Sequence, residues 1–526
     1  MTATSGSSNG SSEREKRYWH LGIVALTLGG ALLILSQTAA DPDLWGHVLF
    51  GLDLLRTGSL PKYDPYSYLT TGHPWINHEL LSEVAFGLAY KVGATPGLML
   101  LKVTVVFAMA LLLHRHLRKE GLDPLRAGIV LILVVFTMIP ALGTIRPQLF
   151  THLFFLMTLL VIIRVEEGNT RWLWSLPILF ALWINFHGGV LAGLGVLGLW
   201  AGAWIVLPFF APGWRGRGPS RGLLLAALGA STLALLLNPY LWELPHFLLR
   251  TATIPRPDIS EWRPLSLTTI PGLLYLILVA SGAFVLLRTR RERRPAMLLV
   301  LMVTALLPLT AIRHLSLFAL TFAVFLAPHI ADVWSMRASK SGSAGGPPGG
   351  SRQARVAILG LNFFAALVMV AASISRFACI PINQHSAIGL PARAVGLLLK
   401  AGTEGNLAIF FDYGEYAIWH LNDRIKVSMD GRRETVYADS IYREALRFQS
   451  GVGAWDDVLD KRPTDMALMP RGLPTYNLLK LKPGWKLAHQ DSLVGLFVRE
   501  GWAPGERLAA TEPPPVSYNG RGLCFP

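Results

Sequence analysis

The stretch LRAGIVLILVVFTMIPALG at residues 125–143 decides the class of this protein. Arg126 is its only charged residue, and a bilayer core about 30 Å thick is crossed by one helix of about 20 apolar residues. Working outward from this stretch, ten further segments have the same character, and each predicts a membrane-spanning helix. The eleven expected spans are 19–38, 97–113, 125–143, 147–163, 172–186, 188–210, 222–238, 270–287, 295–311, 315–331 and 355–375.

The composition of the whole chain agrees with a membrane protein. The 526 residues are 52% hydrophobic and 15% charged, with a mean hydropathy of +0.43, whereas soluble domains carry about 25% charged residues. Two cysteines exclude a disulfide scaffold and a multi-cysteine metal protein. Of the net charge of +15, +13 lies before residue 376, among the expected spans. The basic charge is therefore a signal of topology and of contact with anionic lipid, and we expect no nucleic-acid partner.

The distribution of basic residues sets the expected orientation. Residues 79–92 are apolar but short and charged, so we interpret them as an interfacial or re-entrant helix. With eleven spans and a cytoplasmic N-terminus, the cytoplasmic segments hold 21 Lys and Arg, and the external ones before residue 376 hold eight. Counting 79–92 as a span would move RTRRERR (288–294) outside. The sequence thus predicts a multi-pass protein of a bacterial inner (plasma) membrane.

These spans divide the chain into five parts. The C-terminal part alternates short apolar strands with helical segments, which predicts an extracytoplasmic α/β domain. Cys379 and Cys524 both fall on the external side, where a disulfide and two unpaired thiols are equally expected. The parts are a disordered, basic cytoplasmic N-terminus (1–18), a transmembrane domain (19–331) with an external loop (39–96), a flexible cytoplasmic linker (332–354), a last span (355–375) and the α/β domain (376–526).

Polar residues that are unusual near a membrane gather on the external side of this topology. Such residues are costly there and indicate function by default. Transporters place their coupling residues near the middle of the membrane instead, and the sequence has no paired charges in mid-span. The residues on the external side are Asp41, Asp43, His47, Arg146, Asn185, His187, Asn238, His246, Arg313 and His314.

The external loop is the richest part, and it begins DPDLWGH at residues 41–47. Asp43 precedes an expected surface helix (44–56), so it is either the N-cap of that helix or a functional carboxylate. Asp41 is likewise either a turn residue before proline or functional. His78 and Glu79 either cap the following short helix or join these acids and His47, His73 and Glu83 in binding a divalent cation. No zinc motif is present.

Three further sites each leave two interpretations open. Arg146 has a guanidinium that either binds a phosphate or carboxylate or extends to the lipid headgroups. The same two interpretations apply to Arg313, which is followed by His314. Asn185 and His187 lie in the turn NFHGG (185–189), where Asn185 binds a substrate hydroxyl or satisfies helix carbonyls. A C-terminal group either shapes acceptor binding or forms a capped, ion-paired helix start. This group is Asp430, Arg432, Arg433 and Tyr437.

An acid-bearing first external loop, many spans and an extracytoplasmic C-terminal domain resemble the GT-C superfamily of integral-membrane glycosyltransferases. The likeness is to bacterial members of that class and extends over nearly the whole chain. The motifs that carry it are DPDLWGH (41–47), DPYSY (64–68), PWINHELLSE (74–83), RPQ (146–148), NFHGG (185–189), NPY (238–240), DYGEYAIW (412–419) and MDGRRETVY (429–437).

The resemblance implies transfer of a sugar from a polyprenyl-phosphate-linked donor to a glycan, lipid or protein acceptor at the outer face. It also implies that Asp41 or Asp43 is the catalytic base or a metal ligand. Mg²⁺ or Mn²⁺ is the cation to expect, with Asp41, Asp43 and Glu79 as candidate ligands. An acceptor hydroxyl gives its proton to a carboxylate, and Arg146 and Arg313 stabilise the leaving lipid phosphate. His47, His78, Glu79, Asn185, His187 and His314 are the other candidate substrate-binding residues.

The chain departs from two branches of the class. It lacks the WWD-type motif of oligosaccharyltransferases, and it has Asp-Pro-Asp where protein O-mannosyltransferases show Asp-Glu. These departures leave the sugar, the carrier, the acceptor and the need for a metal open. A non-catalytic scaffold of envelope assembly and a transporter or flippase are the competing interpretations.

Overall fold

The computed structural model describes residues 6–214, 216–254, 256, 259–341, 351–382, 389–421, 424–515 and 523–526. The chain separates into two compact units. Unit 1 comprises Met1–Gln37, Met99–Gly143 and Pro147–Phe377, and unit 2 comprises Thr38–Leu98, Thr144–Arg146 and Ala378–Pro526. Unit 2 therefore joins the expected external loop and the C-terminal domain into one body.

Unit 1 is a bundle of helices. Every one of the eleven expected spans has a helix in it, and eight helices of the described chain are long and apolar enough to cross a membrane. The long ones are α1 (Gly6–Leu35), α3 (Leu80–Lys119), α4 (Pro124–Leu142), α5 (Gln148–Glu166), α7 (Val190–Phe210), α10 (Ile270–Arg288), α12 (Leu315–Ser341) and α13 (Arg352–Ser375); the shorter ones are α6 (Ser175–Phe186), α8 (Arg221–Ala234), α9 (Glu243–Ala252) and α11 (Pro295–Leu306). Of α3, the part up to Leu98 belongs to unit 2 and the part from Met99 onward to unit 1.

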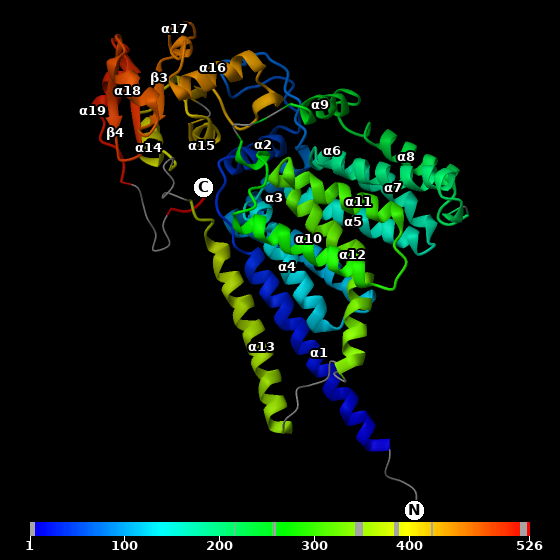
Figure 1. Cartoon of the computed structure of the whole chain (residues 1–526). Helices are drawn as coiled ribbons and strands as arrows, with labels where there is room; N and C mark the ends of the chain where they lie inside the picture. The colour runs from blue at the N-terminus through cyan, green and yellow to red at the C-terminus, as the bar shows by residue number, and fades with distance from the viewer. Residues whose placement is uncertain are drawn as a thin grey trace, which may run out of the picture. The chain divides into compact units, whose positions relative to one another are not determined.

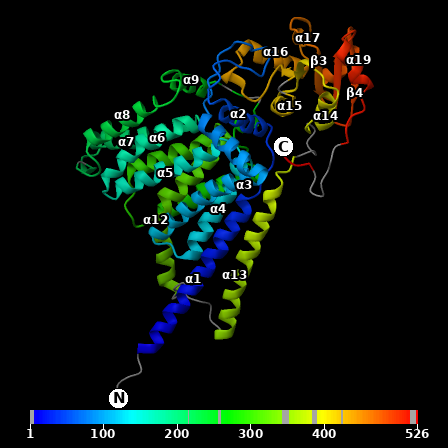
Figure 2. The ribbon, with the colours of Figure 1, turned by 180° about the vertical axis from the view of Figure 1, so that it is seen from behind.

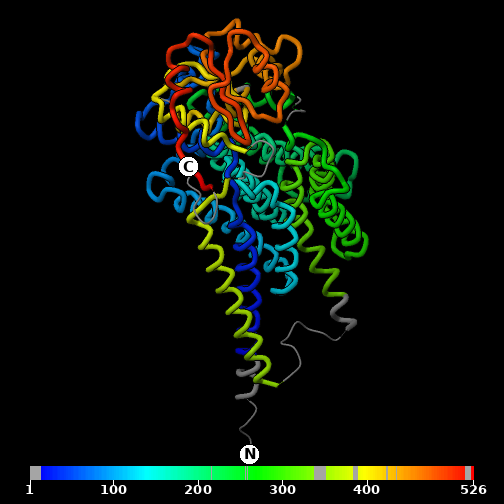
Figure 3. The backbone as a smooth tube through the Cα atoms, turned by 90° about the vertical axis from the view of Figure 1, so that its left-hand side faces the viewer, coloured from blue at the N-terminus to red at the C-terminus, as the bar shows by residue number. Residues whose placement is uncertain are grey.

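The bundle has a central and a peripheral helix. In the apolar stretch of 18 residues that marks each candidate span, 89% of the stretch is buried in α12 but only 11% is buried in α13. Because α12 packs on α4, α5, α10 and α11, it forms the middle of the bundle. The helices α1 and α13 run side by side at its edge, as Figure 1, Figure 2 and Figure 3 show. The exposed apolar side chains of α13 suit contact with lipid.

Three sequence expectations differ in detail from the structure. The short helix expected at 79–92 continues into the next span as α3, with a non-helical break at Ala94. The helix α1 begins at Gly6, inside the stretch 1–18 that we expected to be disordered, and residues 1–5 lie outside the described residues. Of the expected linker, residues 342–350 lie outside the described residues, and α12 extends to Ser341.

Unit 2 is built on a five-stranded sheet in the order β2-β1-β3-β5-β4. The strands are β1 (Gly405–Ile409), β2 (Ile425–Val427), β3 (Met466–Pro470), β4 (Trp485–Gln490) and β5 (Val494–Arg499). The pairs of β1 are parallel and those of β5 are antiparallel. Each of these strands overlaps a short apolar run that predicts a strand in the sequence, and these runs are 406–411, 425–429, 465–469, 485–489 and 493–499. The helices are α2 (Leu44–Thr57), α14 (Ala392–Lys400), α15 (Gly414–Leu421), α16 (Asp439–Ser450), α17 (Asp457–Asp460), α18 (Pro474–Leu481) and α19 (Ala503–Ala510).

The external loop is part of this sheet domain. The Tyr68 amide donates to the carbonyl of Val427 at 3.2 Å, and the Val427 amide donates to the carbonyl of Tyr66 at 3.3 Å. The loop thereby extends the sheet beyond β2. On α2, the fully buried Trp45 packs against the ring of Tyr416 in α15, with ring centroids 5.2 Å apart. These contacts fix the start of α2 against α15.

A disulfide closes unit 2. Cys379 and Cys524 are bonded, with their Cα atoms 5.3 Å apart. The bond links residues 145 positions apart in the sequence, so it ties the beginning of the C-terminal domain to its end. Of the two outcomes left open by the sequence, the structure has the disulfide.

Candidate active site

The two aspartates of the DPD sequence meet Arg146. Arg146 Nη2 lies 2.7 Å from Asp41 Oδ1 and 2.8 Å from Asp43 Oδ2. Asp43 occupies the N-cap position of α2, but its side chain makes no capping hydrogen bond. Asp41 also accepts a hydrogen bond from the Asp43 amide at 3.1 Å. Helix capping therefore does not account for an aspartate at position 43. Asp41, in contrast, both stabilises the turn before α2 and forms an ion pair with Arg146.

Two acids of the DYGEYAIW segment belong to the same cluster. Glu415, on α15, accepts a hydrogen bond from the Gly46 amide of α2 at 3.1 Å. Asp412 precedes α15 and interacts electrostatically with Asp41, Asp43 and Arg146. Sequence reasoning did not single out either acid, although the motif that contains them carried the family resemblance.

Gly431 lies against the cluster from the side of the MDGRRETVY segment. A Cβ atom added at Gly431 would collide with Asp43 Oδ1 and would lie 2.7 Å from Glu415 Oε1. The absence of a side chain at this position is therefore what lets both carboxylates approach the backbone. The DPD turn, α15 and the segment after β2 thus converge on one group of carboxylates.

Burial and mutual repulsion change how these acids titrate. Burial, partly offset by Arg146 and reinforced by Asp41, raises the pKa of Asp43 to about 7. Burial and Asp41 also raise the pKa of Asp412, and burial with Asp43 raises that of Glu415 well above its ordinary value. The side chain of Asp43 is nonetheless 26% exposed. The cluster therefore contains a carboxylate that is accessible and half-ionised near neutral pH.

A second group lies one turn further along α2. His47 Nδ1 is 3.6 Å from Glu83 Oε1 and 3.7 Å from Glu79 Oε2. Burial opposes the charged imidazolium, but the carboxylates of Glu83 and Glu79 outweigh it and raise the pKa of His47. Among the described residues, these three have the spacing of metal ligands. Of the ligands expected from the sequence, Glu79 belongs to this group, while Asp41 and Asp43 pair with Arg146.

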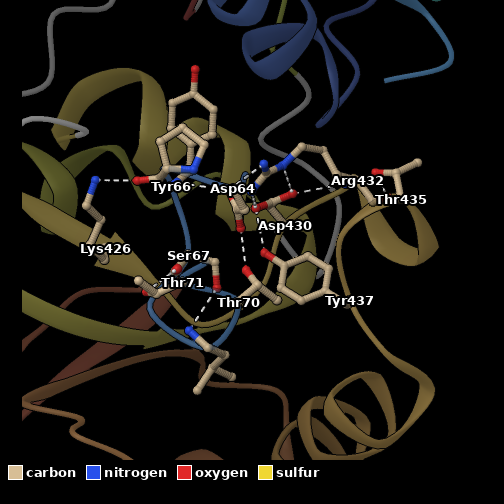
Figure 4. Close-up of polar contacts among 12 residues, drawn as sticks. Asp64, Tyr66, Ser67, Thr70, Thr71, Lys426, Asp430, Arg432, Thr435 and Tyr437 are labelled. Carbon is tan, nitrogen blue, oxygen red and sulfur yellow. Dashed lines mark hydrogen bonds and ion pairs between the residues drawn. The ribbon is translucent and has the colours of Figure 1, made fainter. Parts of the chain in front are cut away.

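A third polar network joins the DPYSY segment to the C-terminal group (Figure 4). Arg432 lies 2.6 Å from Asp64 and 2.6 Å from Asp430, and the Tyr437 hydroxyl donates to Asp430 at 2.6 Å. Thr70 donates to the second oxygen of Asp64. The guanidinium also lies 4.9–5.3 Å from three ring centroids. These rings belong to Phe50, Tyr66 and Trp75.

These contacts have the form of the ion-paired alternative expected from the sequence. Asp430 is fully buried and Arg432 is 8% exposed. Arg433, in contrast, adopts a positive φ of 40° and stacks on Tyr442 at 4.3 Å. The network therefore holds the external loop and the segment 430–437 together, with Gly431 at its centre.

The other candidates lie in unit 1. Asn185 donates to the carbonyls of Ala181 and Leu237, each at 2.8 Å, which is the structural alternative for that residue. His187 Nδ1 lies 2.8 Å from Thr151 Oγ1 and accepts from the Gly189 amide.

Arg313 and His314 lie between α11 and α12. Arg313 stacks on Trp262 at 4.4 Å and lies 3.7 Å from Glu261. His314 Nδ1 is 3.3 Å from the carbonyl of Leu307.

Solved structures provide the comparison. No known protein-family model and no curated protein sequence matches the chain. An oligosaccharyltransferase of Archaeoglobus fulgidus, solved with a tethered acceptor peptide, has a TM-score of 0.53 at 15% identity, covering 86% of this chain and 69% of that one. AglB of the same organism, with an inhibitory peptide and a dolichol-phosphate, has a TM-score of 0.52 at 14% identity, covering 86% and 70%.

A third structure matches over nearly its whole length. ArnT from Cupriavidus metallidurans, bound to undecaprenyl phosphate, has a TM-score of 0.54 at 12% identity, covering 92% of this chain and 98% of that one. The chain shares its fold with these oligosaccharyltransferase and ArnT structures. The predicted fold class, a polytopic helical membrane protein with a C-terminal α/β domain, is confirmed.

Proposed function

We propose that this protein is a membrane glycosyltransferase that moves a sugar from a polyprenyl-phosphate-linked donor to an acceptor hydroxyl at the extracytoplasmic face. Asp43 is the base in this proposal, and Arg146 is the cation at the donor phosphate. The distribution of Lys and Arg supports this orientation, because it leaves the DPD turn on the side with few basic residues.

The ligands of the similar structures support the class of donor. ArnT is bound to undecaprenyl phosphate, and AglB is bound to a dolichol-phosphate. Both ligands are polyprenyl phosphates, so a phosphate on a long apolar chain is the common feature. The acceptor peptide of the oligosaccharyltransferase structure is not shared by ArnT, and we leave the acceptor as a hydroxyl of a glycan, lipid or protein.

The observation that carries the proposal is the state of Asp43. A general base works best when its pKa lies near the working pH, and the pKa of Asp43 is about 7. The carboxylate is exposed enough to meet a substrate, with 26% of its side chain accessible. Arg146 fixes its direction through the 2.8 Å ion pair. Asp41 has the same arginine but half the exposure, 12%, so we assign the base to Asp43.

The reaction then balances in one displacement. The acceptor oxygen forms a bond to the anomeric carbon, and its proton passes to Asp43. The bond between the anomeric carbon and the phosphate oxygen breaks, and the electron pair leaves with the polyprenyl phosphate. Arginine suits the negative charge that develops on that oxygen, because its guanidinium matches phosphate geometry.

Arg146 also links donor binding to the base. Its positive charge lowers the pKa of Asp43 in the free protein. A phosphate that draws the guanidinium away would weaken this effect and make Asp43 a stronger base. Donor binding would thereby raise the proton affinity of Asp43 at the moment when the acceptor is deprotonated.

The test is mass spectrometry of envelope glycans and glycolipids in a deletion strain of the source organism. The strain is complemented with wild type, with Asp43→Asn, or with Asp439→Asn as a matched control at an exposed position of α16. Equal amounts of protein are checked in the membrane fraction. The Cys379–Cys524 disulfide, read from mobility without reductant, reports a folded unit 2.

We expect one sugar modification to be missing in the deletion strain. Wild type and Asp439→Asn should restore it, and Asp43→Asn should lower it by about 10²–10⁴-fold, the usual contribution of a general base. Restoration by Asp43→Asn would remove Asp43 from the chemistry. A deletion strain with no changed glycan or glycolipid would overturn the proposal in favour of a scaffold or a transporter.

A further inference from the structure

The helices α2 and α3 touch at two glycines, and this crossing builds a second site. A Cβ atom at Gly51 would collide with the backbone carbonyl of Glu83, and one at Gly87 would lie 2.6 Å from the carbonyl carbon of Gly51. His47 is one helical turn before Gly51, and Glu83 is one turn before Gly87. The close crossing therefore brings the imidazole of one helix to the carboxylate of the other.

Glu79 completes the group from the turn that precedes α3. His47 Nδ1 and one oxygen of each glutamate lie within 4.8 Å of one another. The other oxygen of each glutamate has a neighbour of its own. Asn77 Nδ2 donates to Glu83 Oε2 at 2.5 Å, and His78 Nε2 lies 3.6 Å from Glu79 Oε1. Such partners fix carboxylates in the way that the surroundings of metal ligands do.

The imidazole nitrogen at the centre of the group is left without a hydrogen bond. His47 is 8% exposed, and its Nδ1 is a buried atom with no hydrogen-bond partner in the described structure. Its separations of 3.6 and 3.7 Å from the two carboxylates exceed a hydrogen-bond distance. Two ligands that each lie about 2.0–2.2 Å from one tetrahedral ion are separated by about 3.5 Å. The spacing thus suits an ion among the three atoms better than direct contact between them.

We propose that His47, Glu79 and Glu83 bind a divalent transition-metal ion, with Zn²⁺ as the fitting member of the class. A nitrogen with two carboxylate oxygens suits zinc and its neighbours, whereas Mg²⁺ and Ca²⁺ take oxygen ligands. Three protein ligands leave a fourth position for water or another oxygen ligand. The site is separate from the pairing of Asp41 and Asp43 with Arg146, and it does not rest on the proposed sugar transfer.

The competing explanation is a charged imidazolium held between two carboxylates. It requires the same three residues but no ion. Metal content separates the two explanations directly, because it does not depend on activity or on knowledge of the acceptor.

The experiment measures metal in the purified full-length protein in detergent, after removal of any histidine tag. The protein is stripped with a chelator, dialysed against Zn²⁺ or Mg²⁺, freed of loose ions by gel filtration, and analysed by elemental mass spectrometry. The variants are His47→Ala and Glu83→Gln. The matched control is His73→Ala, at an exposed histidine of the same loop.

We expect one bound Zn²⁺ per chain in wild type and in His73→Ala, and no bound Mg²⁺. His47→Ala and Glu83→Gln should each lose the Zn²⁺ while they remain monodisperse and keep the disulfide. A variant that aggregates is replaced by a zinc titration of stripped wild type, which should raise its Tm. Wild type that takes up no Zn²⁺ in both measurements would overturn the proposal, as would full retention of Zn²⁺ by both variants.

Discussion

Unit 2 contains two clusters with the same ingredients and opposite character. Each has one arginine between two aspartates: Arg146 with the partly exposed Asp41 and Asp43, and Arg432 with the buried Asp64 and Asp430. In the Arg432 cluster, ion pairs and hydrogen bonds outweigh burial and lower the pKa of Asp430. In the Arg146 cluster, burial and neighbouring acids raise the pKa of Asp43 to about 7.

The difference shows how burial is used. Charges that are fully paired and hydrogen-bonded stabilise a junction between chain segments. The Arg146 cluster has two further acids, Asp412 and Glu415, and their burial and mutual repulsion raise the pKa values of its carboxyl groups. Groups with perturbed pKa values of this kind concentrate at functional sites. The glycine at residue 431 lies next to Asp430 and Arg432 in the sequence and against Asp43 in space. Gly431 therefore connects the Arg432 cluster to the Arg146 cluster.

The largest effect should follow from breaking the Arg432 cluster. Arg432→Met leaves Asp64 and Asp430 buried without their cation, and removing one partner of a buried pair costs about 3–5 kcal/mol. We expect a loss of Tm for the purified protein and rapid proteolysis of residues 39–98 and 378–526. Thermal unfolding followed by tryptophan fluorescence measures the first, and limited proteolysis measures the second.

Arg443→Met is the control for this experiment, because Arg443 is exposed on α16. It should change the Tm little, as surface substitutions do. An Arg432→Met protein as stable as this control would show that the Arg432 cluster does not hold unit 2 together.

A smaller effect, confined to the Arg146 cluster, is expected from Gly431→Ala. The new Cβ would meet the carboxylate ends of Asp43 and Glu415, which can move, so folding should be affected little. A displacement of about 1 Å at a reacting group costs about 100-fold in rate. The measurement is the amount of restored glycan at equal protein levels. Gly472→Ala, where the Cβ meets nothing within 4 Å, is the control and should be fully active. Equal activity of the two variants would place the reaction away from Gly431.

The fold was largely predictable, and the reason is the strength of the apolar signal. Segments such as 125–143 have few charges, so a helix in lipid is their only stable state. The five strands were visible as short apolar runs. The pairing of the external loop with β2 was not, because Tyr66 and Tyr68 bond to Val427 across more than 350 residues. Local pattern contains no information on such contacts.

The candidate site was predictable in part. Asp41, Asp43 and Arg146 were singled out because a charge at the end of an apolar run is unusual, and the structure brings them together. Asp412 and Glu415 lie in the C-terminal α/β domain, where other acids also occur, so their position beside Asp43 gave no sequence signal. Asp430 and Arg432 had two interpretations, and only the geometry distinguishes them. Sequence finds polar residues that are out of place, and it misses those whose role depends on distant neighbours.

The pH dependence should separate the clusters further. As the proposed base, Asp43 can accept a proton only when it is ionised. Activity should therefore begin to decline as the pH falls through about 7, and not only near 3.8, the ordinary pKa of an aspartate. Its raised pKa means that ionisation opposes folding, so its contribution to stability is present at low pH and is lost as pH rises toward 7. Asp430, with a lowered pKa, stabilises the fold above its ordinary pKa and loses that effect in stronger acid. Rates measured from pH 4 to 9 and Tm measured from pH 2 to 9 test both signs. Asp43→Asn should flatten the decline in Tm that is expected as the pH rises toward 7.

The smallest expected effect tests the like-charge part of this account. Asp412 raises the pKa of Asp43, but it is the weakest of the contributions from burial, Arg146, Asp41, His47 and Asp412. Asp412→Asn removes that repulsion and keeps the shape of the side chain. The acid limb of the rate profile should therefore move to lower pH by a fraction of a pH unit, with the plateau rate unchanged. Asp439→Asn, on the exposed face of α16, should leave the limb in place. A limb that moves to higher pH would contradict this account. It would mean that a protonated Asp412 donates a hydrogen bond to the Asp43 carboxylate, so that Asp412 adds no negative charge to the Arg146 cluster.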